Sequence, residues 1–484
     1  MNDIAAPKVS RAGCRLREEI KRLRIERGLS QPSLAALTGY SRQYVSRAER
    51  SHNLPSHDLV RSLDMALGAD GGLLSLWIDA KEEQKARRHT ALPIWASGIQ
   101  FGAVATEGFS GGSILRTPAG RFFSGSVTPL LSAPAVCDGE RVLLKVEGIS
   151  GEWLSVPRRG MVVATADTAE GTRLYGLDRR RVRSSMGKAG MGAPLLVPRA
   201  YELDEFAFGI LWAVTNLDDA LLDDDRELHS IAKSTGTSRT CSGFRAAADP
   251  AGELSAVSRM WLGSNVCAHH VLSNLTQLAG VPVYWSREQR GEEASTWLFF
   301  AHKYDYLRHT SALARSAGAV PTRTFCVPGQ GVEESSGYER VLFLLAAALN
   351  EALGVRVAVC TEAEYTAVHG FVLDRGHRAI VATWVNTDRL WHIDVTDGHP
   401  TLREFGDAIG WADSRSILAA ATPEDRLRGL AEYLRLDLPW VVRRARELGD
   451  HGVGGLIQPR SRLLSLSGLE HACRFLGAVG ISGR

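Results

Sequence analysis

The sequence has no apolar run long enough to cross a membrane, and we expect no secretory leader. The longest apolar run, from Val341 to Leu349, is far shorter than the roughly 20 residues that a membrane-spanning helix needs. The opening residues MNDIAAPKVSRAGCR contain nothing like the apolar centre of a signal peptide. We therefore expect a soluble protein of the cytoplasm with no membrane partner.

Cysteine is scarce, and its spacing is uninformative. The 484 residues include seven cysteines, which are scattered and never form a CxxC pair. This argues against a disulfide framework and against a zinc finger. A Gly-rich phosphate-binding loop is also missing, because the GQG at Gly329–Gly331 is too short to indicate one. We predict neither a metal nor a cofactor, and no cofactor-binding residue is assigned.

The overall composition is that of an ordinary folded protein, with 44% hydrophobic and 23% charged residues, and the length suggests about three domains. The net charge of +3 hides an uneven distribution. Between Val9 and Arg50 there are ten Lys or Arg and four Glu, so the remainder is slightly acidic. A basic N-terminal part predicts a polyanionic partner for that part alone.

Residues 16–50 carry the pattern of three short helices. The first is predicted over residues 16–27, ending at Gly28, because four apolar side chains recur near one face: Leu16, Ile20, Leu23 and Ile25. Ser30 is a good N-cap for a second helix, which tolerates Pro32 in its first turn and packs through Leu34, Ala35 and Leu37.

Gly39 can take the positive φ of a tight turn between the second helix and a third. Ser41 caps that third helix, which runs through Arg50 with Val45 facing inward. A fourth helix opens around Pro55 with apolar residues at helical spacing, and residues 73–77 add a fifth. The spaced residues of the fourth helix are Leu59, Leu63 and Leu67.

Two short helices joined by a Gly-containing turn are the arrangement that presents a helix to the major groove of DNA. Arg and Gln side chains can contact guanine and adenine edges, and Gln31 at a helix N-terminus is placed to hold a phosphate. The predicted DNA-contacting residues are Gln31, Ser41, Arg42, Gln43, Tyr44, Ser46 and Arg47.

With these residues, the stretch 16–78 resembles the Cro/CI-type helix-turn-helix of the Xre family of transcriptional regulators. The resemblance is carried by Ser30-Gln31, Leu34-Ala35, Gly39, the run SRQYVSRAER and Pro55. It implies that the third helix reads bases and that Gln31 contacts the backbone. Pro32 and Ser51-His52 depart from the pattern. An interaction module with incidental basic residues is the alternative.

The next hundred residues change in character. Residues 81–94 are predicted as a linker, and residues 95–200 as a β-rich domain, because short β-prone runs alternate with Gly. One of these runs is EWLSVPR, residues 152–158. The basic run DRRRVR, residues 178–183, is interpreted as a solvated hairpin end, with a second phosphate-contacting patch as the alternative.

Part of the β-rich stretch is similar to the core of LexA-like repressors, which cleave themselves. The similarity lies in LKVEGISGEWLSVPRRGMVVA, with Ser150 as nucleophile and Lys188 as base. Such a lysine must be desolvated enough to be neutral near pH 7. Lys188 lies in the Gly-rich MGKAGMGA, where burial is hard to arrange, so we favour a plain sheet with a surface serine.

Residues 201–249 are predicted as helix and linker, and residues 250–484 as alternating helices and strands. The predicted fold is thus multidomain: an all-α helix-turn-helix bundle (residues 10–80), a small β-rich domain, and an α/β (α+β) C-terminal region.

Several groups in the C-terminal region resemble catalytic or metal-binding sets without completing them. In the run Cys267 to His270, adjacent helical residues point in different directions, so at most two could share a metal. His302 in HKYD and His369 in HGFVLD resemble phospholipase-D-like motifs but lack the correctly spaced Lys. The order of helix 338–353, His369 and WHIDVTD is similar to transglutaminase-like folds, but no cysteine begins the helix.

Aromatic and charged residues are frequent in the same region and could line a ligand pocket, although core packing explains the aromatic ones equally well. They are Trp285, Trp297, Phe299, Phe300, Tyr304, Tyr306, Trp384 and Trp391, with Arg287, Glu288, Arg290, Glu292 and Glu293.

We therefore predict a sequence-specific, DNA-binding transcriptional regulator of a bacterial cytoplasm, associated with the nucleoid. Its partners are double-stranded DNA, a second copy of the chain in a homodimer, and a small-molecule or protein effector. The C-terminal region senses a signal or mediates dimerisation, and no catalytic residue is assigned. The alternative is a DNA-tethered enzyme, either a LexA-like repressor or a degenerate hydrolase or phospholipase-D-like domain.

Overall fold

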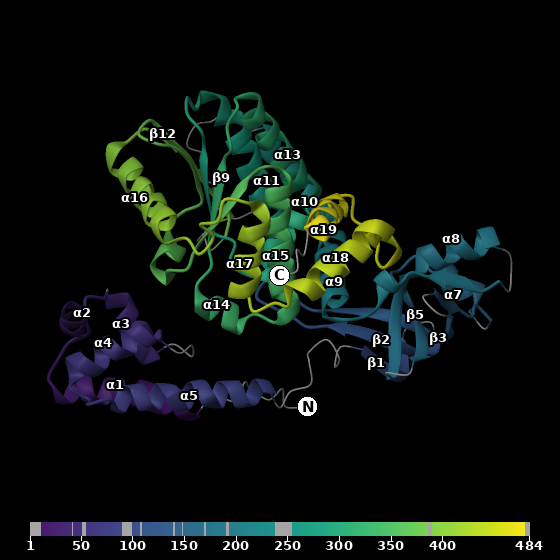
Figure 1. The fold of residues 1–484 in the computed structure, drawn as a ribbon, viewed down its shortest axis with the longest axis horizontal. Coiled ribbons are helices and arrows are strands. Elements are labelled where there is room, and N and C mark those ends of the chain that lie inside the picture. Colours follow the sequence, from purple (N-terminus) through teal and green to yellow (C-terminus); the bar gives the residue numbers. More distant parts are fainter. Residues whose placement is uncertain are drawn as a thin grey trace. The chain divides into compact units, whose positions relative to one another are not determined.

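The computed structural model divides into two compact units, residues 1–97 and 98–484, whose elements are labelled in Figure 1. It describes residues 11–40, 42–50, 55–89, 99–106, 109–138, 141–147, 149–168, 171–189, 193–237, 254–385 and 390–479. Ser41, Ser51-His52 and residues 90–94 of the predicted linker lie outside these ranges. The fold class predicted from the sequence is confirmed: a helical N-terminal part, a strand-rich part and a mixed α/β part follow one another.

In the first unit, the described residues form five helices around one apolar core. They are α1 (Arg11–Glu26), α2 (Gln31–Thr38), α3 (Arg42–Arg50), α4 (His57–Leu67) and α5 (Gly72–His89). The core includes eight side chains at the predicted helical spacings: Leu16, Ile20, Leu34, Ala35, Val45, Leu59, Leu63 and Leu67.

The predicted helix ends of this unit have the expected caps. The Ser30 side chain accepts the backbone N–H of Ser33, and Gly39 ends α2 with a φ of 74°. Ser56 accepts the N–H of Leu59 at the start of α4. The buried Asp64 carboxylate accepts the N–H groups of Gly71 and Leu73, which fixes the turn between α4 and α5.

Three local expectations for this unit differ from the structure. Ile25 and Leu37 are 59% and 61% exposed, because each lies one step round its helix from the buried residues. α5 continues to His89, so residues 81–89 of the predicted linker are helical. Their charged sequence, KEEQKARRH, consists mostly of strong helix formers.

The second unit begins with a seven-stranded sheet. Its longest strand, β3, pairs in turn with β2 through Ser126–Leu130, with β5 through Leu130–Ala135, and with β4 through Ala135–Asp138. The strands are β1 (Ile99–Thr106), β2 (Phe109–Thr117), β3 (Ser126–Asp138), β4 (Arg141–Leu144), β5 (Met161–Thr168), β6 (Gly171–Asp178) and β7 (Leu195–Val197).

Two predictions in this part are wrong. The run EWLSVPR begins in the short helix α7 (Gly151–Ser155), whose Trp153 and Leu154 are buried where α7 packs against the following helix. The basic run DRRRVR is not a hairpin end but the start of α8 (Arg179–Ala189). Arg179 is buried against the Trp153 ring and donates to the Trp153 carbonyl.

The α/β part contains a six-stranded sheet in the order β10-β9-β8-β11-β12-β13. Its strands are β8 (Val283–Ser286), β9 (Thr322–Cys326), β10 (Arg356–Cys360), β11 (Phe371–Asp374), β12 (Arg378–Thr383) and β13 (His392–Thr396). The first three run parallel to one another and the last three pair antiparallel. α16 (His399–Arg415) covers one face, whereas α11 (Ala256–Asn274) and α13 (Ala301–Ser316) lie over the other (Figure 1).

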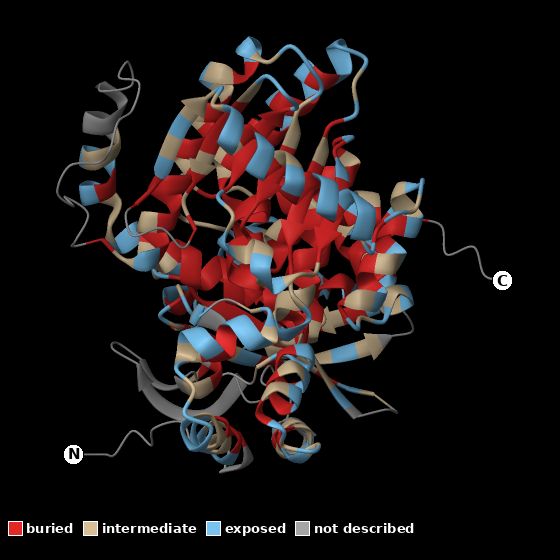
Figure 2. Cartoon of the chain, turned by 90° about the vertical axis from the view of Figure 1, so that its left-hand side faces the viewer, coloured by how far each residue is buried: buried red, intermediate tan, exposed pale blue. Residues whose placement is uncertain are grey.

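Further helices enclose α15 (Gly337–Ala352), whose apolar run Val341–Leu349 is buried throughout. Those packed against it are α9 (Glu205–Asp223), α12 (Gly291–Phe299), α17 (Pro423–Tyr433) and α19 (Ser467–Ala478). The same part of the chain also contains α10 (Asp225–Thr237), α14 (Gly329–Glu334) and α18 (Leu438–His451). Figure 2 shows the buried residues gathered in this interior. Among the described residues, no helix combines the length and apolar character needed to cross a membrane.

Buried carboxylates join the strand-rich and α/β parts. Glu292 of α12 accepts the backbone N–H groups of residues 121–123. Asp218 of α9 pairs with Arg159 and accepts the N–H groups of Arg460 and Ser461. These contacts hold together residues from distant parts of the sequence within the unit of residues 98–484.

Candidate functional site

The first candidate site is α3 and the turn that precedes it. Gly39 lies in the left-handed region at the end of α2, so the chain reverses there without the strain that a Cβ would add. Val45 and Ala48 are buried in the core, Ser46 is half-buried and Arg42 is exposed. The side chains of Gln43, Tyr44 and Arg47 lie outside the described part of the structure.

A buried carboxylate fixes α3 against α1 and α2. Arg24 donates from Nε and Nη2 to the Glu49 carboxylate, at 2.5 and 3.1 Å, and Gln31 Nε2 donates to Glu49 Oε2 at 2.8 Å. The hydrogen bond to Glu49 raises the pKa of Arg24. Gln31, predicted to hold a DNA phosphate, thus has one donor engaged inside the unit, where it ties the start of α2 to α3.

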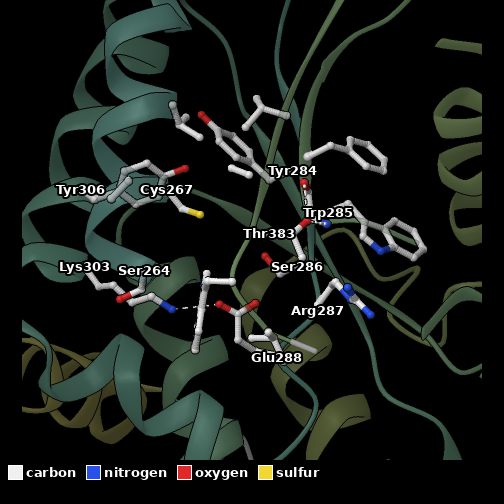
Figure 3. A pocket seen from close by; sticks show the side chains of 18 of the residues that line it. Ser264, Cys267, Tyr284, Trp285, Ser286, Arg287, Glu288, Lys303, Tyr306 and Thr383 are labelled. Atoms are coloured by element: carbon white, nitrogen blue, oxygen red, sulfur yellow. Dashed lines mark hydrogen bonds and ion pairs between the residues drawn. The ribbon is translucent and has the colours of Figure 1, made fainter. Parts of the chain in front are cut away.

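The second candidate site is a pocket in the second unit, with about 540 Å³ of empty space that is partly open to solvent. It lies between the sheet face formed by β8, β9, β11 and β12 and the helices α11, α12 and α13 (Figure 3). The pocket is lined by four members of the aromatic set singled out from the sequence: Trp285, Trp297, Tyr306 and Trp384.

Lys303 is 3% exposed and projects from α13 into this pocket. Its ammonium donates to Glu288 Oε1 and to Thr296 Oγ1, each at 2.9 Å, and lies 3.8 Å from the Trp297 ring centre and 4.5 Å from that of Trp384. Burial lowers the pKa of Lys303 to about 8, and Glu288 opposes that shift.

Arg323 of β9 is 4% exposed and lies on the same wall. Nη1 donates to Ser286 Oγ at 2.8 Å, and the guanidinium lies 4.6 Å from the ring centres of both Tyr284 and Trp297. Among the described residues, no carboxylate forms an ion pair with Arg323. Its Nε–H and the indole Nε1–H of Trp297 are buried without a hydrogen-bond partner there.

The side chains of β8 alternate between the two faces of the sheet. In Figure 3, Trp285 and Arg287 point away from Cys267, Lys303 and Tyr306. Trp285 stacks on Phe371 on the α16 side, and Arg287 donates to the Thr366 carbonyl. From the sequence, five charged residues could line a pocket, and of these Glu288 faces the cavity. Glu292 and Glu293 serve as buried acceptors for backbone N–H groups.

The nucleophile-like residues of this region are held in unreactive settings. Burial raises the pKa of the Cys267 thiol, which favours the protonated form. The neighbouring imidazoles turn away from it: His269 Nδ1 contacts the Asn265 carbonyl and His270 Nε2 that of Asp394. Within the described ranges, no three His, Cys, Asp or Glu residues gather as a metal site requires.

His302 is half-buried, and its Nε2 lies 2.9 Å from Ser264 Oγ. Ser264 also donates to the Trp261 carbonyl, and His302 Nδ1 has no partner in the described part of the chain. The contact thus lacks the third group that orients the base of a hydrolase triad. His369 is exposed and stacks edge-on against His392.

The residues proposed for self-cleavage are both at the surface. Ser150 precedes α7 and Lys188 belongs to α8, and each side chain is exposed. The structure therefore does not provide the burial that a neutral catalytic lysine requires.

Sequence reasoning did not single out Arg323 or assign Lys303 to a binding site. The signal for Arg323 was present, because one arginine interrupts the strand TRTFC, whose other residues are apolar or small. For Lys303, nothing in the local sequence shows that α13 turns it inward.

The match to a known family is confined to the first unit. Residues 15–77 match the family model of the helix-turn-helix domain. No curated protein and no solved structure matches the chain at a significant level. The matched stretch spans α1 to α4 and the beginning of α5, including the Gly39 turn and α3. Residues 15–77 therefore form a helix-turn-helix domain, a module that binds DNA.

Proposed function

We propose that this protein is a transcriptional regulator of the Cro/CI (Xre) type that binds specific double-stranded DNA sequences through α3. The observation that carries the proposal is the α2–Gly39–α3 arrangement within the helix-turn-helix domain. A short helix that follows a tight turn and packs on the core through Val45 can enter the major groove as a rigid element, so its exposed side chains meet base edges in a defined register.

In this proposal, six residues at the start of α3 and along its sequence contact DNA: Ser41, Arg42, Gln43, Tyr44, Ser46 and Arg47. Arg42 is exposed at the first position of the helix, which suits a bidentate contact to guanine. Gln31 supports the interface in two ways, through its bond to Glu49 and through a contact to the DNA backbone.

One such helix reads only a few base pairs, so useful specificity calls for two copies on paired half-sites. We therefore propose a homodimer at the nucleoid of a bacterial cytoplasm. The second unit senses a signal or mediates the pairing. Its pocket, with three buried charged side chains, Glu288, Lys303 and Arg323, supports the sensing role for a small-molecule effector.

The proposal is tested by replacing Arg42 and Gln43 together with Ala and mapping binding sites across a genome. Loss of base contacts worth about 1–3 kcal/mol each should change the preferred sequence. Gln31→Ala should instead weaken all sites nearly uniformly. Arg61→Ala, at an exposed position of α4, is the matched control. An unchanged site preference in the Arg42/Gln43 variant would contradict the recognition-helix assignment.

No catalytic step forms part of this function. Ser150→Ala, Lys188→Ala, His302→Gln and His369→Ala, made one at a time, should each retain DNA binding and regulation. Loss of regulation with intact folding and DNA binding in any of them would favour the DNA-tethered enzyme instead.

A further inference from the structure

The charges that face the pocket do not balance. Lys303 and Glu288 form one ion pair at 2.9 Å. Arg323 is equally buried and, within the described ranges, has no carboxylate partner. A buried charge without a counter-charge is costly because water no longer solvates it. The pocket as it stands is therefore one negative charge short.

Two hydrogen-bond donors on the same wall of the pocket have no acceptor among the described residues. Arg323 Nε and Trp297 Nε1 are buried and have no partner among the described residues, and neither group can accept a hydrogen bond. An unpaired buried donor costs about 1–3 kcal/mol. Both residues line the cavity, so an acceptor bound there lies next to the charge of Arg323 and reaches the two buried donors through a small shift of these side chains.

The remaining surface is apolar and largely aromatic. Tyr284, Trp297, Tyr306 and Trp384 contribute rings, and Val271 and Val372 contribute aliphatic groups. Aromatic walls of this kind pack against flat, apolar bodies by offset or edge-to-face contacts. The cavity is partly open to solvent, so a ligand from solution can reach these rings.

A cationic ligand does not fit this arrangement, although Glu288 and two indoles are groups that bind cations. Lys303 already lies within cation–π distance of Trp297 and Trp384 and pairs with Glu288. A ligand cation would have to displace this ammonium and would also meet Arg323.

We propose that the pocket binds a small organic anion, a carboxylate attached to a planar aromatic body. The carboxylate accepts from Arg323 Nε and Trp297 Nε1, and the ring packs between Tyr284, Tyr306 and Trp384. The binding site stands on the geometry alone; its role as the effector site of a DNA-binding regulator rests on the proposed function.

The test is isothermal titration calorimetry of the full-length protein with matched probes. These are phenylacetate, phenylacetamide and phenethylamine, and the corresponding indole series of indole-3-acetate, indole-3-acetamide and tryptamine. Within each series the body is constant and the head group is an anion, a neutral amide or a cation. We expect at least one carboxylate to bind, and ten-fold or more tighter than its amide and its amine.

Two variants locate the site. Arg323→Met removes the charge and the donor and should weaken carboxylate binding about 10- to 100-fold, the range of a charge-assisted hydrogen bond. Ala382→Phe fills the cavity from a half-buried position on its wall and should block binding even if Arg323→Met does not fold. Arg375→Gln, at an exposed ion pair with Asp413, is the control and should bind as the wild type does.

The proposal is overturned if neither carboxylate binds at millimolar concentration, if an amide binds as tightly as its acid, or if an amine binds best. It is also overturned if folded Ala382→Phe retains wild-type affinity. DNA binding is measured separately on the same samples: loss of the proposed regulatory function would leave ligand binding intact, and failure of the ligand site would leave DNA binding intact.

Discussion

The ammonium group of Lys303 lies 2.9 Å from a carboxylate oxygen of Glu288, and both side chains are at most 5% exposed. Two indole rings and a second cation, Arg323, surround the pair. Burying charged groups this deeply lowers the stability of the fold, so changes in the charge of this pair should change the free energy of unfolding of the second unit.

Stability should rise with pH in a window set by Lys303. Its pKa is about 8 in the folded chain and 10.5 as the ordinary value, so between these pH values the unfolded state binds more protons. The free energy of unfolding therefore increases from pH 8 to 10.5, by up to about 3 kcal/mol. Below pH 8 the full cost of burying the ammonium remains.

The measurement is urea unfolding of the wild type and of the double variant Lys303→Met with Glu288→Gln, across this pH range. Other groups titrate alike in both proteins, so the difference in unfolding free energy isolates the pair. A difference that stays flat from pH 8 to 10.5 would contradict the lowered pKa of Lys303.

Glu49 should be critical for the stability of the helix-turn-helix unit. Its carboxylate is 2% exposed and receives donors from Arg24 and Gln31. Glu49→Ala leaves Arg24 without its partner and should cost about 3 kcal/mol. Native-state hydrogen exchange of α1 to α3, read by mass spectrometry on the full chain, measures the loss. Glu26→Ala breaks an exposed ion pair with Arg22, and this variant should show the hydrogen exchange of the wild type. If Glu49→Ala and Glu26→Ala raised the exchange rates equally, the prediction for Glu49 would be wrong.

Gly39 should resist substitution because of its backbone conformation. With a φ of 74° and no atom within 4 Å of the place that a Cβ would occupy, Gly39→Ala introduces strain without a clash, worth about 1–2 kcal/mol. Protection of α2 and α3 from hydrogen exchange should fall, and DNA affinity with it. Gly72→Ala, at an open position in the first turn of α5 without positive φ, should be neutral or stabilising. The prediction fails if Gly39→Ala is the better tolerated of the two.

Glu292 should govern the junction between the strand-rich and α/β parts. It accepts the N–H groups of Arg121, Phe122 and Phe123 at 2.9–3.2 Å. Glu292→Gln turns an amide donor toward these donors and should cost about 2–3 kcal/mol. Faster hydrogen exchange at residues 121–123 is the expected signature. Glu404→Gln, on the exposed face of α16, is the control and should leave the exchange rate of residues 121–123 unchanged. An unchanged exchange rate in Glu292→Gln would contradict the prediction.

The elements of the helix-turn-helix unit follow from local sequence. Ser30 and Ser56 cap helices and Gly39 makes the turn, because these preferences act within three or four residues and need no distant partner. Apolar spacing identified the buried faces of α2 and α4 through Leu34, Leu59 and Leu63. The same spacing misplaced Ile25 and Leu37, because the width of a buried face depends on which helices pack against it.

Local patterns fail where a distant residue decides the outcome. Trp153 suits a strand by propensity, yet it is buried in a helix, and Arg179 packs on its ring. Glu292 and Glu293 lie beside Arg290 in the sequence, which suggested polar handles for a ligand. Three backbone donors from residues 121–123 instead make Glu292 structural.

By itself the sequence determined the helix-turn-helix unit, the succession of strands and helices behind it, and the absence of long apolar segments. These properties depend on short-range periodicity, capping and composition. Only the tertiary structure brought Glu288, Lys303 and Arg323 to one cavity, because they reside on different elements and meet through the packing of α13 on the sheet. Their unequal charges and unpaired donors depend on burial, and burial is a property of the fold.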